Sequence, residues 1–345
     1  MKKVYILISI TSSQNQTLLN VIEYFKSIGI SMSNIYLVTN TNDNIIKSFS
    51  INLIRLSKIS SIKSFFQQIF FRKNKKLLYD MILNLNKYDS IQVLVPHFLN
   101  ILSNYFYTAS SRRLGKDKLK IALYPDGMLS YQPYSINSKY DPYLLKRWLV
   151  GKLIGTPFKL FNGPIADPFN VIDFIYTYLP NETIEYNSKK LIKIAFPKSD
   201  ISGNNMLILG HFNQSRFQKV DLISISRAIK KLPMLKKVKR IYYKIHPRLK
   251  SSRNDLFYRV LKLDKSLPIE IVQDNQPIEM SIKKLKSSTV IAAVSTSLVN
   301  LKLKFGEDLK CYYFGLDDYV SSDYTKYYNK IFKQLKINNL VQNNV

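Results

Sequence analysis

The sequence of 345 residues has a single cysteine, Cys311, and only 10 glycines and 13 prolines. One cysteine excludes a disulfide framework and fits a reducing compartment. The low glycine and proline content excludes collagen-like and low-complexity chains. Acidic residues are scarce too, with 23 Asp and Glu against 52 Lys and Arg and a formal net charge of +29. Hydrophobic residues make up 46%, which excludes disorder over most of the chain, and the length indicates two domains.

Long hydrophobic runs are also missing, because no run reaches the roughly 18 apolar residues of a membrane-spanning helix. The N-terminus has two lysines and then the apolar stretch Val4–Ile10, as a signal peptide does. That stretch is short, and the polar segment Thr11–Gln14 follows it where a small-residue cleavage site would stand. We favour a buried first β-strand, with a signal peptide as the alternative, and expect a cytoplasmic protein.

The excess of positive charge favours a polyanionic partner, and a background bias toward Lys, Asn and Ile, which gives solvated faces with no dedicated partner, is the alternative. Of the 52 cations, 41 are Lys and 11 are Arg. Because Arg makes the bidentate contacts that read bases, this ratio argues against nucleic acid as the partner. Lys suits diffuse attraction to an anionic bilayer, and Ser64–Lys76 and Tyr140–Val150 mix aromatic residues with cations, so contact with the inner face of the cell membrane is one expectation. Packing of both segments on a sheet, with lysines in water, is the other.

Strand and helix patterns alternate along the chain. Expected strands are Val4–Ile10, Asn34–Val38, Ile51–Leu56, Ile91–Val95, Lys120–Tyr124, Met206–Leu209, Lys239–Ile245, Ile269–Val272, Val290–Val294 and Lys310–Phe314. Expected helices are Thr17–Ile28, Ser61–Leu85, Phe98–Ala109, Asp221–Lys231, Asn254–Leu261, Ile278–Leu285, Leu298–Phe305 and Tyr324–Ile337. Such alternation predicts an α/β fold with parallel sheets.

A segment rich in Asn, Lys, Ser and Pro, between Pro180 and Asn205, is expected to separate two Rossmann-like domains. We expect an N-terminal domain over residues 1–190 and a C-terminal domain over residues 200–320, facing each other across a cleft. Residues 321–345 are expected to hold a C-terminal helix, and a return of that helix to the N-terminal domain is left open.

Ligands of parallel sheets bind beyond the carboxyl ends of the strands, and unusual polar residues gather there at four points. The first is Tyr124–Gly127, which follows an expected strand and reads Tyr-Pro-Asp-Gly. A carboxylate held on a tight turn, here that of Asp126, suits a general base that takes a proton from a substrate hydroxyl. An ordinary Pro-Asp-Gly turn is the alternative.

The second point is His246-Pro247, at the end of another expected strand. It holds one of only three histidines in the chain. An imidazole fixed there can protonate the phosphate oxygen of a leaving group or donate a hydrogen bond to it, and Lys244 and Arg248 raise the local positive potential. A surface histidine in a basic stretch is the alternative.

The third and fourth points lie at expected helix starts. Glu279, next to a helix start at Pro277, could accept two hydroxyl hydrogens from a ribose, or merely complement the helix dipole. Ser295–Ser297, a run of three hydroxyl side chains before a helix, suits an anion, and an ordinary N-cap is the alternative.

Taken in this order, the motifs resemble those of the bacterial sialyltransferases of the GT-B fold, the capsule, lipooligosaccharide and O-antigen enzymes. Asp126-Gly127 looks like their acidic-acidic-glycine motif, although Pro125 replaces the first acid, which leaves open whether Asp126 or another carboxylate is the base. His246-Pro247 resembles their His-Pro motif, and Ser295–Ser297 their serine/threonine motif. Pro277–Glu279 is similar to a ribose-binding Pro-x-Glu of some members.

The resemblance implies a GT-B enzyme that moves sialic acid from CMP-sialic acid, with inversion, to a sugar hydroxyl. The expected acceptor sugar is a galactoside. The acceptor would be an oligosaccharide of a bacterial surface glycan, with a lipid-linked form left open, bound by the N-terminal domain. The resemblance assigns catalysis to Asp126 and His246. It assigns donor binding in the C-terminal domain to Gly210, Pro247, Glu279, Ser295, Thr296 and Ser297. Candidate acceptor or sugar contacts are Thr11, Ser12, Gln14 and His97.

Neither a cofactor nor a metal is expected. The chain has no Asp-x-Asp, the spacing with which many sugar-nucleotide enzymes hold a metal on a diphosphate, and its single cysteine and scattered histidines offer no zinc set. A CMP-linked donor has one phosphodiester, which imidazole and hydroxyl groups can bind. The alternatives are a GT-B transferase that uses CMP-Kdo or a UDP-sugar, and a non-catalytic protein that binds polyanions.

Overall fold

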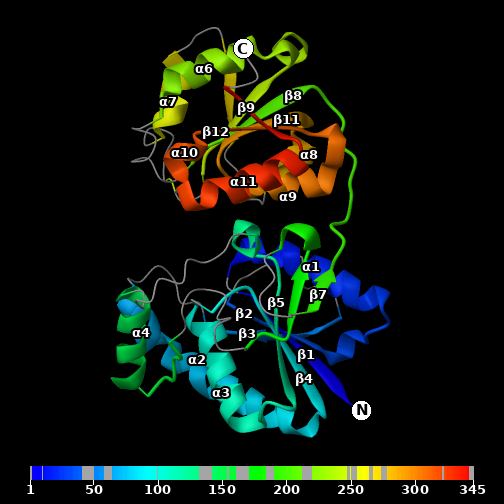
Figure 1. The fold of residues 1–345 in the computed structure, drawn as a ribbon, viewed down its shortest axis with the longest axis vertical. Coiled ribbons are helices and arrows are strands. Elements are labelled where there is room, and N and C mark those ends of the chain that lie inside the picture. Colours follow the sequence, from blue (N-terminus) through cyan, green and yellow to red (C-terminus); the bar gives the residue numbers. More distant parts are fainter. Residues whose placement is uncertain are drawn as a thin grey trace. The chain divides into compact units, whose positions relative to one another are not determined.

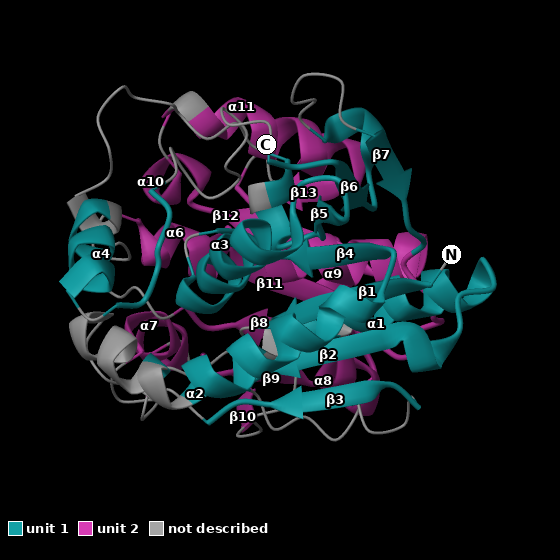
Figure 2. Cartoon of the chain, turned by 90° about the horizontal axis from the view of Figure 1, so that it is seen from below, with its two compact units in different colours: residues 1–195 teal, residues 196–345 magenta. Residues whose placement is uncertain are grey.

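The computed structural model shows two compact units, residues 1–195 and 196–345 (Figure 2). It describes residues 2–9, 11–40, 50–57, 64–98, 100–131, 142–153, 155–160, 171–183, 190–211, 220–246, 249, 255–263, 267–272, 278–320 and 322–341. The chain divides after Ala195, which lies between the expected domain ends at 190 and 200.

In unit 1 the described strands form one parallel sheet, in the order β3-β2-β1-β4-β5-β6-β7 (Figure 1). The strands are β1 (Lys3–Ser9), β2 (Ile35–Thr39), β3 (Asn52–Arg55), β4 (Ser90–Val95), β5 (Leu119–Leu123), β6 (Phe174–Thr177) and β7 (Lys190–Lys193). The helices are α1 (Ser12–Ser27), α2 (Ser64–Asn84), α3 (Ile101–Leu114) and α4 (Pro142–Leu153). The short 3-10 helix η4 (Gly127–Ser130) follows β5.

In unit 2 the described strands form a second parallel sheet, in the order β10-β9-β8-β11-β12-β13. The strands are β8 (Asn205–Leu209), β9 (Ile241–Lys244), β10 (Ile269–Val272), β11 (Ser287–Ala293), β12 (Lys310–Phe314) and β13 (Ile337–Asn339). The helices are α6 (Leu222–Lys231), α7 (Leu256–Leu263), α8 (Ile278–Lys284), α9 (Thr296–Phe305), α10 (Leu316–Tyr319) and α11 (Ser322–Gln334).

The central strands β1, β4, β8 and β11 are buried along most of their length because both faces of each sheet are covered. In β1, Val4, Ile6 and Ile8 join the core cluster that also holds Leu78 of α2 and Phe106 of α3. On the other face, Tyr5 packs against Phe25 of α1, with ring centroids 4.6 Å apart. This two-sided burial explains why the sequence shows continuous apolar runs at these strands.

Both sheets have the same kind of strand order. In unit 1 the first strands lie side by side from β1 outward to β3, and β4 then lies on the other side of β1. In unit 2 the strands run from β8 outward to β10, and β11 then lies on the other side of β8. The loops after β1 and β4 therefore lead to opposite sides, and so do those after β8 and β11. Such a reversal leaves an opening at the carboxyl ends of the strands, where ligands of doubly wound sheets bind. Each unit thus has one predicted binding edge.

The structure corrects several element boundaries. Helix α1 begins at Ser12 instead of Thr17, because the Thr11 N–H donates to Gln14 Oε1 at 3.3 Å and the Gln14 N–H donates to the Thr11 carbonyl at 3.1 Å, which caps an earlier turn. The last helix ends at Gln334, and Lys336, with φ of 52°, turns the chain into β13. That strand pairs with β12, so β13 adds to the sheet of unit 2.

Candidate functional site

The Tyr-Pro-Asp-Gly motif follows β5, the strand beside the β1–β4 reversal point of unit 1. The buried Tyr124 hydroxyl donates to the Ile8 carbonyl at 2.7 Å, which ties the end of β5 to the end of β1. Burial, with a smaller contribution from Asp126, raises the pKa of Tyr124 well above its ordinary value, so the hydroxyl stays protonated as a donor. Gly127 has φ of 60°, and the Asp126 N–H donates to Ser130 Oγ at 3.0 Å. The backbone around the carboxylate is therefore held on both sides.

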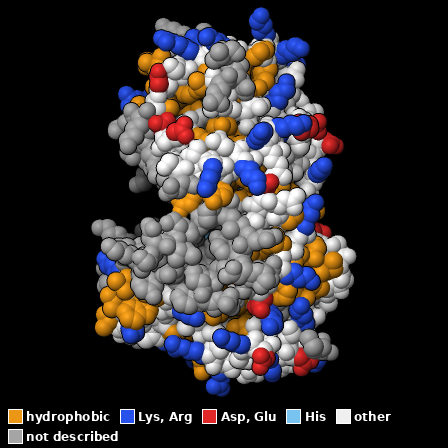
Figure 3. Space-filling view, viewed as in Figure 1, with side chains coloured by type: hydrophobic (Ala, Val, Ile, Leu, Met, Phe, Trp, Pro, Cys, Tyr) orange, Lys and Arg blue, Asp and Glu red, His pale blue; other side chains and the backbone are white. Residues whose placement is uncertain are grey.

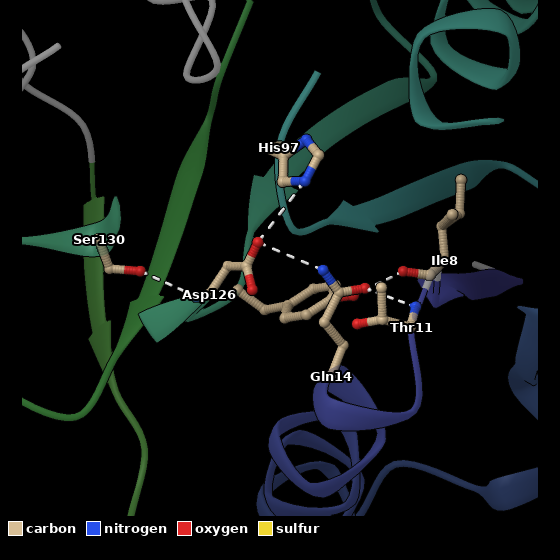
Figure 4. A network of polar contacts seen from close by, with 7 residues as sticks. Ile8, Thr11, Gln14, His97, Asp126 and Ser130 are labelled. Carbon is tan, nitrogen blue, oxygen red and sulfur yellow. Dashed lines mark hydrogen bonds and ion pairs between the residues drawn. The ribbon is translucent and has the colours of Figure 1, made fainter. Parts of the chain in front are cut away.

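The carboxylate of Asp126 meets side chains from two other elements (Figure 4). Its Oδ2 accepts a hydrogen bond from Gln14 Nε2, in the first turn of α1, at 3.2 Å. The Nε2 of His97, just after β4, lies 3.6 Å from the same oxygen. Gln14 is buried, whereas the side chains of Asp126 and His97 are 23% and 18% exposed. The group combines a buried support with a carboxylate that solvent or a ligand can reach.

The surroundings of His97 favour the neutral form of its imidazole. Burial lowers its pKa from the ordinary value, the charge of Asp126 acts in the opposite direction, and the charge of Arg147 lowers the pKa further. Its Nδ1 is buried and has no hydrogen-bond partner within the part of the chain that the structure describes. The polar contact of this ring is therefore made by Nε2, on the side of Asp126.

Of the residues predicted for this domain, the structure brings Asp126, Gln14 and His97 together. Thr11 supports Gln14 through its backbone N–H, and its own side chain is exposed. The side chain of Ser12 lies outside the described residues. Sequence reasoning did not identify Arg147, because it comes from α4 and no local signal connects it to the strand ends.

In unit 2, two histidines and a tyrosine gather at the carboxyl edge of the sheet. His246 follows β9, His211 follows β8, and their ring centroids are 6.5 Å apart. The ring of Tyr319, in α10, packs edge-on against the ring of His211, with ring centroids 4.8 Å apart. No motif in the sequence predicts a role for His211, and Tyr319 was missed because it follows a different strand, β12. Pro247 lies outside the described residues.

Gly210 directly follows β8 and lies against two buried polar side chains, those of Asp255 and Tyr243. Its N–H donates to the Lys244 carbonyl at 2.9 Å. A Cβ on Gly210 would lie 2.6 Å from Asp255 Oδ2 and 3.0 Å from the Tyr243 hydroxyl. Asp255 is fully buried, and this burial raises the pKa of its carboxyl, an effect that the Tyr243 hydroxyl partly offsets. The space that a side chain would need at Gly210 is thus already filled by the protein's own polar groups.

The remaining predicted donor residues lie at two helix starts. Ser295 caps α9, and its Oγ accepts from the Ser297 N–H at 3.2 Å. The side chains of Thr296 and Ser297 are half-buried beside it. Glu279 is buried in the first turn of α8. Burial lowers the pKa of Lys304, and the charge of Glu279 acts in the opposite direction. The capping role of Ser295 is compatible with an anion at the same helix end.

The described residues hold neither a metal-ligand cluster nor a membrane-spanning helix. No three side chains of the types His, Cys, Asp or Glu in the described ranges lie close enough to hold a metal ion. No described helix is long and apolar enough to span a lipid bilayer.

The fold is similar to solved GT-B-like structures. A UDP-GlcNAc 2-epimerase from Methanocaldococcus jannaschii is 15% identical, with a TM-score of 0.53 over 96% of this chain and 92% of that chain. A putative UDP-N-acetylglucosamine 2-epimerase from Listeria monocytogenes is 12% identical, with a TM-score of 0.52 over 92% of this chain and 80% of that chain. At this identity the likeness concerns the fold alone, and it confirms the prediction of an α/β fold of GT-B type with two Rossmann-like units.

No curated protein matches the sequence of this chain at a significant level. The sequence model of one family, described as alpha-2,8-polysialyltransferase (POLYST), matches residues 1–313. That match covers all of unit 1, residues 196–313 of unit 2, and all four motifs at the strand ends. The chain therefore belongs to the alpha-2,8-polysialyltransferase family, and it is a glycosyltransferase of the sialyltransferase class.

Proposed function

We propose that this enzyme transfers sialic acid from CMP-sialic acid, with inversion at the anomeric carbon, to a hydroxyl group of a bacterial surface glycan, as a step in capsule or lipopolysaccharide biosynthesis. The observation that carries the proposal is the partly exposed carboxylate of Asp126, held by Gln14 and His97 at the strand reversal of unit 1. The description of the family supports an acceptor that ends in sialic acid. A galactoside acceptor is the alternative.

Inversion is a single displacement, in which the acceptor oxygen attacks the anomeric carbon while the bond to the CMP phosphate breaks. In this proposal Asp126 takes the proton of the acceptor hydroxyl, and His246 protonates the departing phosphate oxygen or donates a hydrogen bond to it. The hydroxyl groups of Ser295–Ser297 and the N-terminus of α9 bind the phosphate, and Glu279 binds the ribose. The other proposed donor contacts are Gly210 and Pro247.

The proposal includes no metal and no cofactor. A CMP-linked donor carries one phosphodiester charge, which an imidazole, hydroxyl groups and a helix N-terminus can bind. The absence of any Asp-x-Asp from the sequence supports this part of the proposal.

The first test is release of CMP from CMP-sialic acid, with acceptors that end in sialic acid or in galactose. Asp126→Asn removes the proposed base with little change of shape, and we expect kcat to fall by roughly a hundredfold or more. Asp117→Asn is the matched control, because Asp117 is an exposed carboxylate of the same unit. An Asp126→Asn variant that turns over at the control rate would remove Asp126 from the mechanism.

The same assay separates the alternative functions. A donor panel that adds CMP-Kdo and UDP-sugars distinguishes the GT-B transferases by which nucleotide is released. A protein that only binds polyanions would release no nucleotide from any donor, and Asp126→Asn would leave its binding of polysaccharide unchanged. His246→Ala tests the proposed leaving-group residue in unit 2 by the same readout.

The location that we propose is the inner face of the cell membrane, with α4 as the contact. Leu145, Leu149 and Leu153 are 40%, 49% and 85% exposed, and their spacing of four places them on one face of the helix. Hydrophobic side chains gather over α4 with Lys and Arg beside them (Figure 3), and Lys152 Nζ lies 4.0 Å from the centre of the Trp148 ring. An apolar stripe bordered by cations fits an anionic bilayer surface.

A further inference from the structure

Both described donors that face the Asp126 carboxylate face the same oxygen. Gln14 Nε2 donates to Oδ2 at 3.2 Å, and His97 Nε2 lies 3.6 Å from Oδ2 (Figure 4). Among the described residues, none donates a hydrogen bond to Oδ1. The two oxygens of this carboxylate therefore have different surroundings.

The orientation of Gln14 is fixed from its other end. The Thr11 N–H donates to Gln14 Oε1 at 3.3 Å, and a backbone N–H can only be a donor. The side-chain oxygen must therefore face Thr11, which leaves the Nε2 amide group to face Asp126. This assignment follows from the hydrogen-bond network and does not depend on distinguishing oxygen from nitrogen.

The tautomer of His97 follows from its surroundings in the same way. A neutral imidazole carries one N–H, and its Nδ1 is buried without a partner in the described part of the chain. Its Nε2 faces a carboxylate oxygen, so the hydrogen is on Nε2. Since nothing described accepts a proton from Nδ1, the ring has no partner through which to relay a proton onward.

We infer that His97 is a positioning residue for the proposed base: its Nε2–H and the Gln14 amide hold Asp126 Oδ2, which leaves Oδ1 to take the proton of the acceptor hydroxyl. The inference rests on the proposed role of Asp126. The distance of 3.6 Å is longer than a hydrogen bond, and such contacts tighten when substrate binds. One O–H bond of the acceptor breaks and one forms on Oδ1, while the His97 hydrogen stays on Nε2.

Two similar substitutions test this role. In His97→Gln the side-chain amide nitrogen can stand where imidazole Nε2 stands, whereas in His97→Asn the amide reaches only the position of Nδ1. We expect His97→Asn to lower kcat by roughly tenfold to a hundredfold with the acceptor KM little changed, because the base is misplaced. We expect His97→Gln to keep kcat within about threefold of the wild type.

Three outcomes would overturn the inference: wild-type kcat in His97→Asn, equal loss in both variants, or a loss confined to the acceptor KM. The last would identify His97 as a direct acceptor contact. Thermal unfolding of both variants controls for the fold.

A second readout is independent of activity. Nitrogen-15 NMR of the His97 ring should show the Nε2–H tautomer, titrating below the ordinary value of about 6.5 because burial and Arg147 lower the pKa of this ring. Asp126→Asn should lower the pKa of His97 further, since the Asp126 charge raises it. An Nδ1–H tautomer would reject the geometry. If CMP release does not depend on Asp126, the proposed function fails, and the tautomer still tests the contact.

Discussion

Gly210 shows how a single residue can constrain unit 2. A Cβ there would lie 2.6 Å from Asp255 Oδ2, 3.0 Å from the Tyr243 hydroxyl and 3.2 Å from the Lys244 carbonyl. The Lys244 carbonyl belongs to the backbone, which cannot easily shift. The Asp255 side chain is short, and its Oδ1 accepts a hydrogen bond from the Tyr258 N–H at 3.3 Å, so this side chain cannot easily move away either. The glycine is required by packing against the ends of β9 and α7.

We therefore expect Gly210→Ala to lower the free energy of unfolding by about 1–3 kcal/mol, the usual cost of overpacking. Urea unfolding measures this change. Adding Asp255→Ala removes the nearest atom, so the cost of Gly210→Ala should shrink in that background. An equal cost in both backgrounds would show that Asp255 is not the source of the clash.

Single residues also mark the limit of what sequence could predict about the site. Asp126 and His246 were recognisable because each follows a strong strand pattern and breaks it with a polar residue. Tyr319, Asp255 and Arg147 were not, since their contacts depend on residues far away in the chain. The approach of Gln14 to Asp126 needs the early start of α1, which came from a cap and not from hydrophobic periodicity.

At the scale of helices and strands, mostly apolar parallel strands were the easiest elements to predict. Ile269–Val272 and Lys310–Phe314 match β10 and β12 residue for residue. Strands β6 and β7 were missed, and β7 lies in the segment whose polar composition indicated a linker. The three-residue β13 was missed because it begins at Ile337, the last residue of the expected terminal helix.

Helix α4 carries a prediction at this scale. We expect Leu149→Glu together with Leu153→Glu to weaken binding to vesicles that contain phosphatidylglycerol by roughly tenfold or more, because the leucine side chains no longer bury apolar surface. Co-sedimentation measures the affinity. Leu263→Glu, at the end of α7, is the matched control, since Leu263 is 83% exposed. Equal loss in the control, or equal binding to neutral phosphatidylcholine vesicles, would contradict α4 as an anionic membrane contact.

At the scale of the whole chain, one strand order is used twice, and each copy places its polar residues at the point where the order reverses. Unit 1 gathers Gln14, His97 and Asp126 there, and in unit 2 Gly210, His246 and the start of α9 follow β8, β9 and β11. This duplication agrees with a division of labour in which one unit binds the acceptor and the other binds the donor. The net charge of +29 suits substrates and surfaces that are anionic.

The most direct test is a crystal structure with CMP and a sialylated oligosaccharide bound. The account predicts that an acceptor hydroxyl lies within hydrogen-bond reach of Asp126, about 2.6–3.2 Å, and that the CMP phosphate lies within the same reach of His246. An acceptor bound away from Asp126, or CMP bound away from the carboxyl edge of the β8–β11 reversal, would contradict it.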